Sequence, residues 1–162
     1  PIALYNTKDL HEPGDNLWQQ DYPEPTERIT FGDVSTTGEG TDLAIVSYAN
    51  GFYLSCQAQK ALAAQGIQAR VIDLNWLHPL PMESLLEAIA PCKKVLIVDE
   101  CRETGSLSEE LMARLQEAGS KHTVARLTAD DSFIPLAKAA YYVLPSVEGI
   151  VEKAKKLMGT VK

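Results

Sequence analysis

The sequence predicts an α/β fold in which a mostly parallel sheet lies between two layers of helices. Short apolar runs rich in β-branched residues alternate four times with segments whose apolar side chains recur at helical spacing. Glycine or proline ends most of these units, as is typical of compact strand and helix boundaries. Such alternation requires right-handed βαβ crossovers, which cover both faces of the sheet, so we expect a three-layer α/β/α domain.

The first elements follow from a change of period along the chain. Residues 28–34 alternate apolar and polar side chains, which predicts a half-exposed edge strand. Residues 43–48 form a near-continuous apolar run, which predicts a strand buried on both faces. A helix is expected over 54–65 because its apolar residues share one face, and Gly66 is placed to end it.

The middle of the chain repeats this unit. Residues 67–74 predict a second parallel strand. Pro81 stands at a first helical position before apolar residues at i, i+3, i+4 and i+7, and Pro91 closes the helix. Residues 94–99 form the third apolar run and predict another central strand.

The last third predicts a helix over 107–118 that Gly119 ends, and an alternating strand over 122–127. Residues 128–145 contain two prolines and are expected to be a loop. Ser146 then caps a final amphipathic helix. The apolar runs belong at the centre of the sheet and the alternating segments at 28 and 122 at its edges.

Composition narrows the classes of function. The chain has 162 residues, 45% of them apolar, and a formal charge of −7, which argues against a nucleic-acid partner. No apolar stretch approaches the ~20 residues of a membrane span, so no membrane partner is expected. Three scattered cysteines, Cys56, Cys92 and Cys101, suit reduced thiols in a cytoplasmic protein. The sequence begins at Pro1, as though cut from a longer protein.

The strongest candidate for a ligand site is the carboxyl edge of the sheet, where α/β proteins bind ligands. There the Asn50-Gly51 turn would meet the loop from Asp99 to Gly105, and both open helices. The acidic residues of that loop oppose a phosphate, and the bulk of Phe52 and Tyr53 keeps a pyrophosphate from the backbone. The turn is then a structural corner. The candidate ligand or subunit-contact residues are Asn50, Gly51, Phe52, Tyr53, Glu100, Thr104 and Gly105.

Other sites find little support in the sequence. The three histidines are far apart and none has a partner at metal-ligand spacing, so no metal site is expected. No serine lies in a G-x-S-x-G motif, so no catalytic nucleophile is expected. Asp99 and Glu100 could form an acid–base pair, but neighbours in a strand point to opposite faces, which favours helix-capping charges instead.

Several segments, taken in their order along the chain, resemble the C-terminal domain of the transketolase family. The resemblance is strongest to the β subunit of the 2-oxoacid dehydrogenase decarboxylase component, of pyruvate, branched-chain or acetoin type. The resemblance covers about residues 40–158. The segments that carry it are GTDLAIVSYANG at 40–51, VIDL at 71–74 with LHPL at 77–80, the strand from Val95 to Glu100 with Thr104-Gly105, and LPSV at 144–147.

The resemblance implies a mixed five-stranded sheet of order 1-3-2-4-5, with the first strand, near 28–34, antiparallel to the rest. It implies an end of a preceding domain plus an interdomain arm with the edge strand over 1–40, and the family domain over 41–162. The parent would be an oxidoreductase that uses thiamine diphosphate and Mg²⁺, held by motifs that cannot be placed in this chain. Implied partners are an α-type subunit or domain, a second β-type subunit and the acyltransferase component, so a homo-oligomer is expected.

Two hypotheses about function follow. The first is an assembly domain of a thiamine-diphosphate enzyme without catalysis of its own, and therefore without a cofactor, catalytic or metal site in this chain. The second is a stand-alone nucleotide or small-molecule binding domain that uses the crest at Asn50-Gly51 and Thr104-Gly105.

Overall fold

The computed structural model describes residues 9, 14–17, 24–26 and 28–160. The chain divides into two compact units, residues 1–31 and 32–162, and all the assigned helices and strands of the described residues lie in the second. Residues 1–5, where the resemblance implies the end of the preceding domain, fall outside the described residues. In chain order the elements are β1 (Ser35–Thr37), β2 (Leu43–Ser47), α2 (Ala49–Ala63), β3 (Ala69–Asp73), α3 (Met82–Ile89), β4 (Lys94–Arg102), α4 (Leu107–Glu117), β5 (Thr123–Ala129), the 3₁₀ helix η1 (Ala137–Tyr142) and α5 (Val147–Met158).

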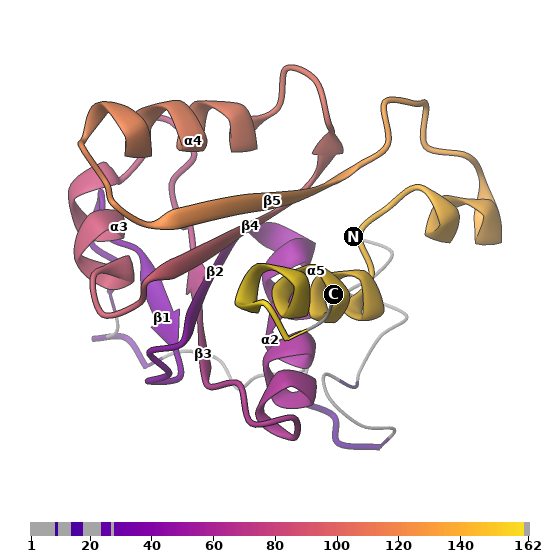
Figure 1. Ribbon diagram of the computed structural model, residues 1–162, viewed down its shortest axis with the longest axis horizontal. Helices are drawn as coiled ribbons and strands as arrows, with labels where there is room; N and C mark the ends of the chain where they lie inside the picture. Colours follow the sequence, from indigo (N-terminus) through magenta and orange to yellow (C-terminus); the bar gives the residue numbers. More distant parts are fainter. Residues whose placement is uncertain (1–8, 10–13, 18–23, 27, 161–162) are drawn as a thin grey trace. The chain divides into compact units, whose positions relative to one another are not determined.

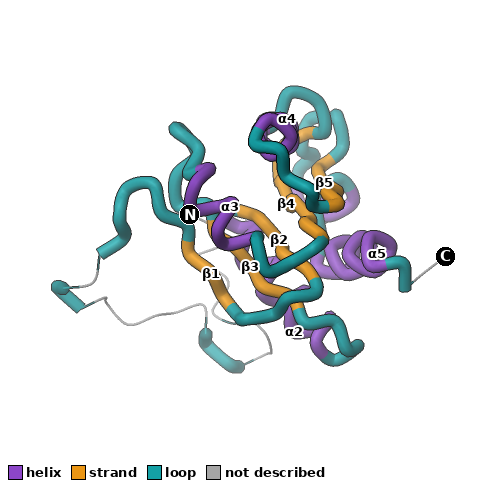
Figure 2. The backbone as a smooth tube through the Cα atoms, turned by 60° about the vertical axis from the view of Figure 1, so that its left-hand side comes forward, coloured by secondary structure: helices purple, strands orange, loops and turns teal. Residues whose placement is uncertain are grey.

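The five strands form one mixed sheet of order β1-β3-β2-β4-β5, as expected. Strands β2 to β5 are parallel, and β1 pairs with β3 in the antiparallel sense. Figure 2 shows β1 at one edge and β5 at the other. The three apolar runs are therefore the inner strands, because only inner strands bury both faces along their length.

Two layers of helices cover the sheet (Figure 1). Helices α2 and α5 pack on the side chains of one face, which include Ile45, Val71 and Leu96. Helices α3 and α4 pack on the other face, which includes Val46 and Ile97. Successive strand residues enter opposite layers, as the two-residue period of a strand requires. The expected three-layer α/β/α architecture is confirmed.

The helix ends follow the sequence signals. Gly66, with φ of 81°, follows the end of α2. Its N–H donates a hydrogen bond to Ala63 O, and the N–H of Ile67 donates to Leu62 O. This is the double hydrogen bond of a Schellman motif, which needs a left-handed residue. Ser146 caps α5 by accepting a hydrogen bond from Gly149 N over 3.1 Å. None of the helices among the described residues is long and apolar enough to cross a membrane.

The first edge strand was placed wrongly by the sequence. It lies at Ser35–Thr37 and not at 28–34, because the chain turns at Phe31-Gly32, where Gly32 has φ of 87°. The backbone is then held by side chains distant in sequence. Ser84 Oγ accepts from Val34 N over 3.1 Å, and Asn75 Nδ2 donates to Ser35 Oγ over 2.9 Å.

Two other boundaries differ from the predictions. Strand β4 continues past Asp99 to Arg102 through an irregular register. The loop between β4 and α4, here called the crest loop, therefore covers only residues 103–106. The expected loop over 128–145 contains η1, and Figure 1 shows this segment running outward from β5 before it returns to α5.

Candidate functional site at the carboxyl edge of the sheet

The Asn50-Gly51 turn lies inside the first turn of α2 and not in a loop before it. Ala49, the first residue of the helix, has φ of 48°. A non-glycine residue in this conformation costs about 1–2 kcal/mol, so β2 enters α2 through a strained corner. A Cβ built on Gly51 would lie 2.4 Å from Ser47 Oγ, so the absence of a side chain lets α2 pack closely on β2.

Asp99 lies fully buried at the end of the regular part of β4. Its Oδ1 accepts hydrogen bonds from Tyr48 Oη over 2.6 Å and Cys101 N over 2.9 Å, and its Oδ2 accepts from Ser108 N over 2.8 Å. Burial by itself would raise the pKa of Asp99, but these bonds outweigh it and lower the pKa. The carboxylate is therefore ionised and caps α4, at whose N-terminus negative charge is favoured.

Glu100 extends to the other helix. Its Oε1 accepts from Asn50 Nδ2 over 2.6 Å, and its Cγ lies 3.8 Å from the position of a Cβ on Gly51. The first turn of α2 has no acidic residue of its own, so Glu100 of β4 supplies that charge. Asp99 and Glu100 thus do not form an acid–base pair, because each lies at a different helix N-terminus.

Thr104 and Gly105 are also engaged within the fold. Thr104 N donates to Asp131 Oδ1 over 2.8 Å, and the Thr104 hydroxyl donates to the other oxygen of the same carboxylate. Gly105 N donates to Glu109 Oε2 over 3.0 Å. The pKa of Asp131 is lowered by the two hydrogen bonds from Thr104. The crest loop therefore meets carboxylates of its own chain where a phosphate oxygen would bind.

Phe52 and Tyr53 follow the turn on α2. Phe52 packs against the core shared by α2 and α5, and its ring meets that of Tyr53 edge to face at 5.4 Å. Both side chains are half-buried. Phe52 therefore contributes to the core of this domain.

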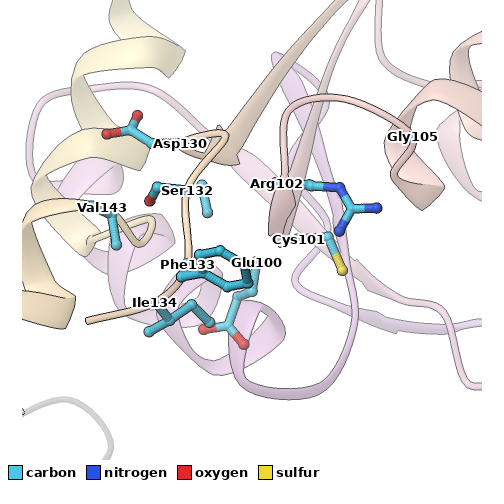
Figure 3. Close-up of a pocket in the computed structure, with 10 residues that line it drawn as sticks. Glu100, Cys101, Arg102, Gly105, Asp130, Ser132, Phe133, Ile134 and Val143 are labelled. Carbon is cyan, nitrogen blue, oxygen red and sulfur yellow. The ribbon is translucent and has the colours of Figure 1, made fainter. Parts of the chain in front are cut away.

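A cavity of about 480 Å³ lies beside the crest, between the end of β4 and the segment after β5. Figure 3 shows Ser132 and Phe133 on one side of it and Cys101 and Arg102 on the other. Glu100 and Gly105, two of the predicted residues, line this cavity; the remaining lining residues are Ala129, Asp130, Ile134 and Val143.

Two side chains with exchangeable protons, Tyr48 and Cys101, lie near Asp99 at this edge. The pKa of the Tyr48 hydroxyl is raised by burial and by its bond to Asp99, so it stays protonated and acts as a donor. Cys101 Sγ lies 3.6 Å from that hydroxyl. Among the residues that the structure describes, no group of three or more His, Cys, Asp or Glu side chains is placed to hold a metal ion. The arrangement caps helices and ties loops together.

Sequence reasoning missed Tyr48, Asp131 and Arg126. Arg126 donates to Glu103 O over 2.7 Å and lies 3.7 Å from the carboxylates of Glu103 and Glu109, so it anchors the crest loop to β5. These contacts join residues 17 or more positions apart, and no local spacing indicates them. The only available signal was the alternation over 122–127, which places Arg126 on the face opposite Ala125 and Leu127.

Comparison with known families finds a match to a family profile. The profile of the transketolase C-terminal domain matches residues 32–150. This range contains every helix and strand from β1 to the start of α5.

Among curated proteins, the chain is similar to β subunits of the pyruvate dehydrogenase E1 component. It is 26% identical to that of Bacillus subtilis over 144 residues, which are 87% of this chain and 44% of the relative. It is also 26% identical to that of Acholeplasma laidlawii over 160 residues, 97% of this chain and 48% of the relative. The chain thus spans about half the length of the curated relatives it matches.

Two solved structures share the fold. A protein described as a split-gene transketolase in an inactive β4 tetramer superposes with a TM-score of 0.73 and 26% identity, covering 86% of this chain and 46% of that one. A 2-oxoglutarate:ferredoxin oxidoreductase from Magnetococcus marinus superposes with a TM-score of 0.58 and 22% identity, covering 78% of this chain and 20% of that one. The second likeness concerns the fold alone.

Proposed function

Because the chain belongs to the transketolase C-terminal domain family, we propose that it is the assembly domain of a thiamine-diphosphate-dependent 2-oxoacid dehydrogenase and has no catalysis of its own. The parent enzyme decarboxylates a 2-oxo acid and transfers the acyl group. Similarity to pyruvate dehydrogenase E1 β subunits, of which this chain spans less than half, supports this context.

The observation that carries the proposal is that a carboxylate lies at the N-terminus of each of the two helices at the crest. Asp99 lies at the N-terminus of α4 and Glu100 at that of α2, so each position where a diphosphate would bind has a carboxylate of this chain. The negative charges of these two carboxylates would repel the negative charges of a diphosphate bound beside them. The residues present do not fit thiamine diphosphate with Mg²⁺, and we assign that cofactor to other parts of the parent enzyme.

This role requires partners. We propose an α-type subunit or domain and a second β-type chain as the main ones, with the acyltransferase component as a third, all in the cytoplasm. The β4 assembly of the similar split-gene transketolase supports contact between β-type chains. Self-association would place this domain at a subunit boundary.

Isothermal titration calorimetry tests the proposal directly. Thiamine diphosphate with Mg²⁺, titrated into the chain, should release no binding heat, and the chain alone should not decarboxylate pyruvate. Tight binding of the cofactor would overturn the proposal. A parallel titration with ATP tests the rival nucleotide-binding hypothesis, since binding that Glu100→Gln strengthens would show that the crest is a site held closed by that carboxylate.

A further inference from the structure

Asn50 is followed by glycine, and this is the one Asn-Gly pair in the sequence. In such a pair the backbone nitrogen of the second residue can attack the side-chain amide of the first. Glycine allows the attack most readily, because it has no side chain that would shield its nitrogen. Asparagine is among the chemically labile residues for this reason. The corner between β2 and α2 therefore has the residue types required for spontaneous deamidation.

The reaction takes place in two steps and requires only water. In the first, Gly51 N attacks Cγ of Asn50, a bond forms between these atoms, and the bond from Cγ to Nδ2 breaks. The amide nitrogen leaves as ammonia and carries the proton that was on Gly51 N. In the second, water opens the cyclic imide at one of its two carbonyl carbons, which leaves an aspartyl or isoaspartyl residue at position 50.

Two features of the fold leave this pair open to reaction. Asn50 is exposed, so water can reach the imide that forms there. The first hydrogen bond of α2 is donated by Phe52 N to Tyr48 O over 3.3 Å. Gly51 N precedes that bond, and the helix offers no acceptor for the N–H groups at its start. The positive end of the helix dipole also favours loss of the proton from an attacking nitrogen.

Two other features oppose the reaction. Closure of the imide ring requires rotation about the Cα–C bond of Asn50 away from the helical range, and Asn50 lies within α2. The second is Glu100, whose Oε1 accepts a hydrogen bond from Asn50 Nδ2 over 2.6 Å and whose Cγ lies 3.8 Å from the position of a Cβ on Gly51. Its carboxylate holds the amide and opposes the negative charge that develops during attack.

The product would change the junction between β4 and α2. An aspartate at position 50 has no N–H to donate, so the bond to Glu100 is lost. Two carboxylates would then stand where donor and acceptor are now 2.6 Å apart, and like charges at this range repel each other. The same corner already contains Ala49 with φ of 48°. Deamidation would therefore remove a contact from a part of the fold that is already strained.

We infer that Asn50 is a site of spontaneous deamidation that Glu100 restrains, and that hydrolysis at this site weakens the junction of β4 with α2. The inference goes beyond the proposed function and does not rest on it, since the chemistry depends only on the corner itself. Cofactor binding by the chain would overturn the proposed function and leave this inference standing.

Peptide mapping by mass spectrometry measures the reaction on the 162-residue chain, incubated at neutral pH in water enriched in heavy oxygen. Heavy oxygen that enters residue 50 marks hydrolysis during the incubation. The folded chain should react at least about tenfold more slowly than the chain unfolded in guanidinium, because the folded chain must first open locally. Glu100→Ala should raise the folded rate about three- to tenfold, since a hydrogen bond to a charged group is lost. Glu100→Gln keeps an acceptor without the charge and should fall between.

Three controls separate the role of Glu100 from a general loss of stability. Unfolded Glu100→Ala should react at the same rate as the unfolded unaltered chain. Glu87→Ala, which removes an exposed glutamate of α3, should leave the folded rate unchanged. Ser146→Ala removes the cap of α5 and destabilises the fold away from the corner, so it should accelerate the reaction less than Glu100→Ala. A folded chain that reacts as fast as the unfolded one, or a Glu100→Ala rate equal to that of the unaltered chain or of Ser146→Ala, would overturn the inference.

Asn50→Asp reproduces the aspartyl product and tests its consequence. In the unaltered chain this substitution should lower the midpoint of thermal unfolding, because the new carboxylate meets that of Glu100. In the Glu100→Gln background it should lower the midpoint less or raise it, since an acidic residue in the first turn of a helix is favourable once the opposing charge is removed. An equal shift in both backgrounds would show that the product does not act through Glu100 and would overturn the assigned consequence.

Discussion

The hydroxyl of Tyr48 donates a hydrogen bond to Oδ1 of Asp99 over 2.6 Å, joining the ends of two strands across 51 positions of sequence. Through the same carboxylate, β4 also holds the first turn of α4. A buried carboxylate with several donors is stabilising only while it stays ionised and all its bonds are made. The crest is therefore held in place by a charge that the core encloses.

Asp99→Asn should lower the free energy of unfolding at pH 7 by about 1–3 kcal/mol. The amide has only one oxygen that accepts hydrogen bonds, so at least one buried donor is left without a partner. Urea unfolding followed by circular dichroism measures this loss. Asp130→Asn, in which the replaced carboxylate is exposed, is the control and should change stability little. Equal losses in the two variants would contradict the assigned role.

The loss should also depend on pH. The fold lowers the pKa of Asp99, so its contribution is present above the unfolded pKa of about 3.9 and is lost as the pH falls through the folded value. The difference between the unaltered chain and Asp99→Asn should therefore be constant from pH 7 to 5 and shrink below about pH 4. A difference that grows on acidification would reverse the sign and refute the assignment.

The two serines that precede helices should differ in importance. Ser146 Oγ accepts from Gly149 N, whereas Ser106 makes no capping bond and its hydroxyl pairs with that of Ser108 over 2.7 Å. Ser146→Ala should cost about 1 kcal/mol, the usual value of an N-cap. Ser106→Ala should cost less, because Asp99 already caps α4. Thermal unfolding of the two variants makes the comparison, and the reverse ranking would be inconsistent with it.

The inner strands and their helices were predictable because burial requires apolar residues at regular local spacing, as continuous runs in the strands and along one face of each helix. Strands β2, β3 and β4 and helices α3 to α5 lie within three residues of their predicted positions, whereas α2 begins five residues earlier than predicted. The position of the edge strand β1 was not predictable, because an exposed segment has no such pattern of apolar residues. Its position at Ser35 depends on two hydrogen bonds, one that Asn75 donates to Ser35 and one that Ser84 accepts from Val34, each joining residues 40 or more positions apart.

The candidate site was only partly predictable for a similar reason. The opposite directions of Asp99 and Glu100 follow from strand geometry alone. The bond between Thr104 and Asp131 and the exposure of Phe133 depend instead on how far the segment after β5 projects. Pro135 and Pro145 indicated a loop, and a loop gives no sign of which of its apolar side chains will be covered.

Replacing Ala49 by glycine should stabilise the protein. Ala49 has φ of 48°, which costs about 1–2 kcal/mol, while glycine loses about 0.5–1 kcal/mol of chain entropy, so a net gain of about 0.5–1 kcal/mol is expected. The control is Ala63→Gly, at an exposed position near the end of the same helix, which should cost about 1 kcal/mol. Chemical unfolding of both variants should show opposite signs, and a loss for both would argue against strain at Ala49.

Gly51→Ala should be strongly destabilising although alanine favours helices. The new methyl group would lie 2.4 Å from Ser47 Oγ, which donates to Val98 O over 2.8 Å, so either α2 moves or a buried hydrogen bond breaks. We expect a loss of about 1–3 kcal/mol. Gly149→Ala in α5 is the matched control, because its methyl group would lie 3.4 Å from its nearest neighbour, and it should be neutral or stabilising by up to about 1 kcal/mol.

A double-mutant cycle identifies the cause of the Gly51 effect. Ser47→Ala removes the oxygen that the new methyl group would meet, and it carries its own cost because the hydrogen bond to the Val98 carbonyl is lost. In the Ser47→Ala background, Gly51→Ala should therefore cost clearly less than in the unaltered chain, giving a coupling of at least about 0.5 kcal/mol. Additive losses in urea unfolding would mean that Gly51 is required for another reason, such as access to the helix N-terminus, and the Asn50-Gly51 turn would then have to be reconsidered as a binding element.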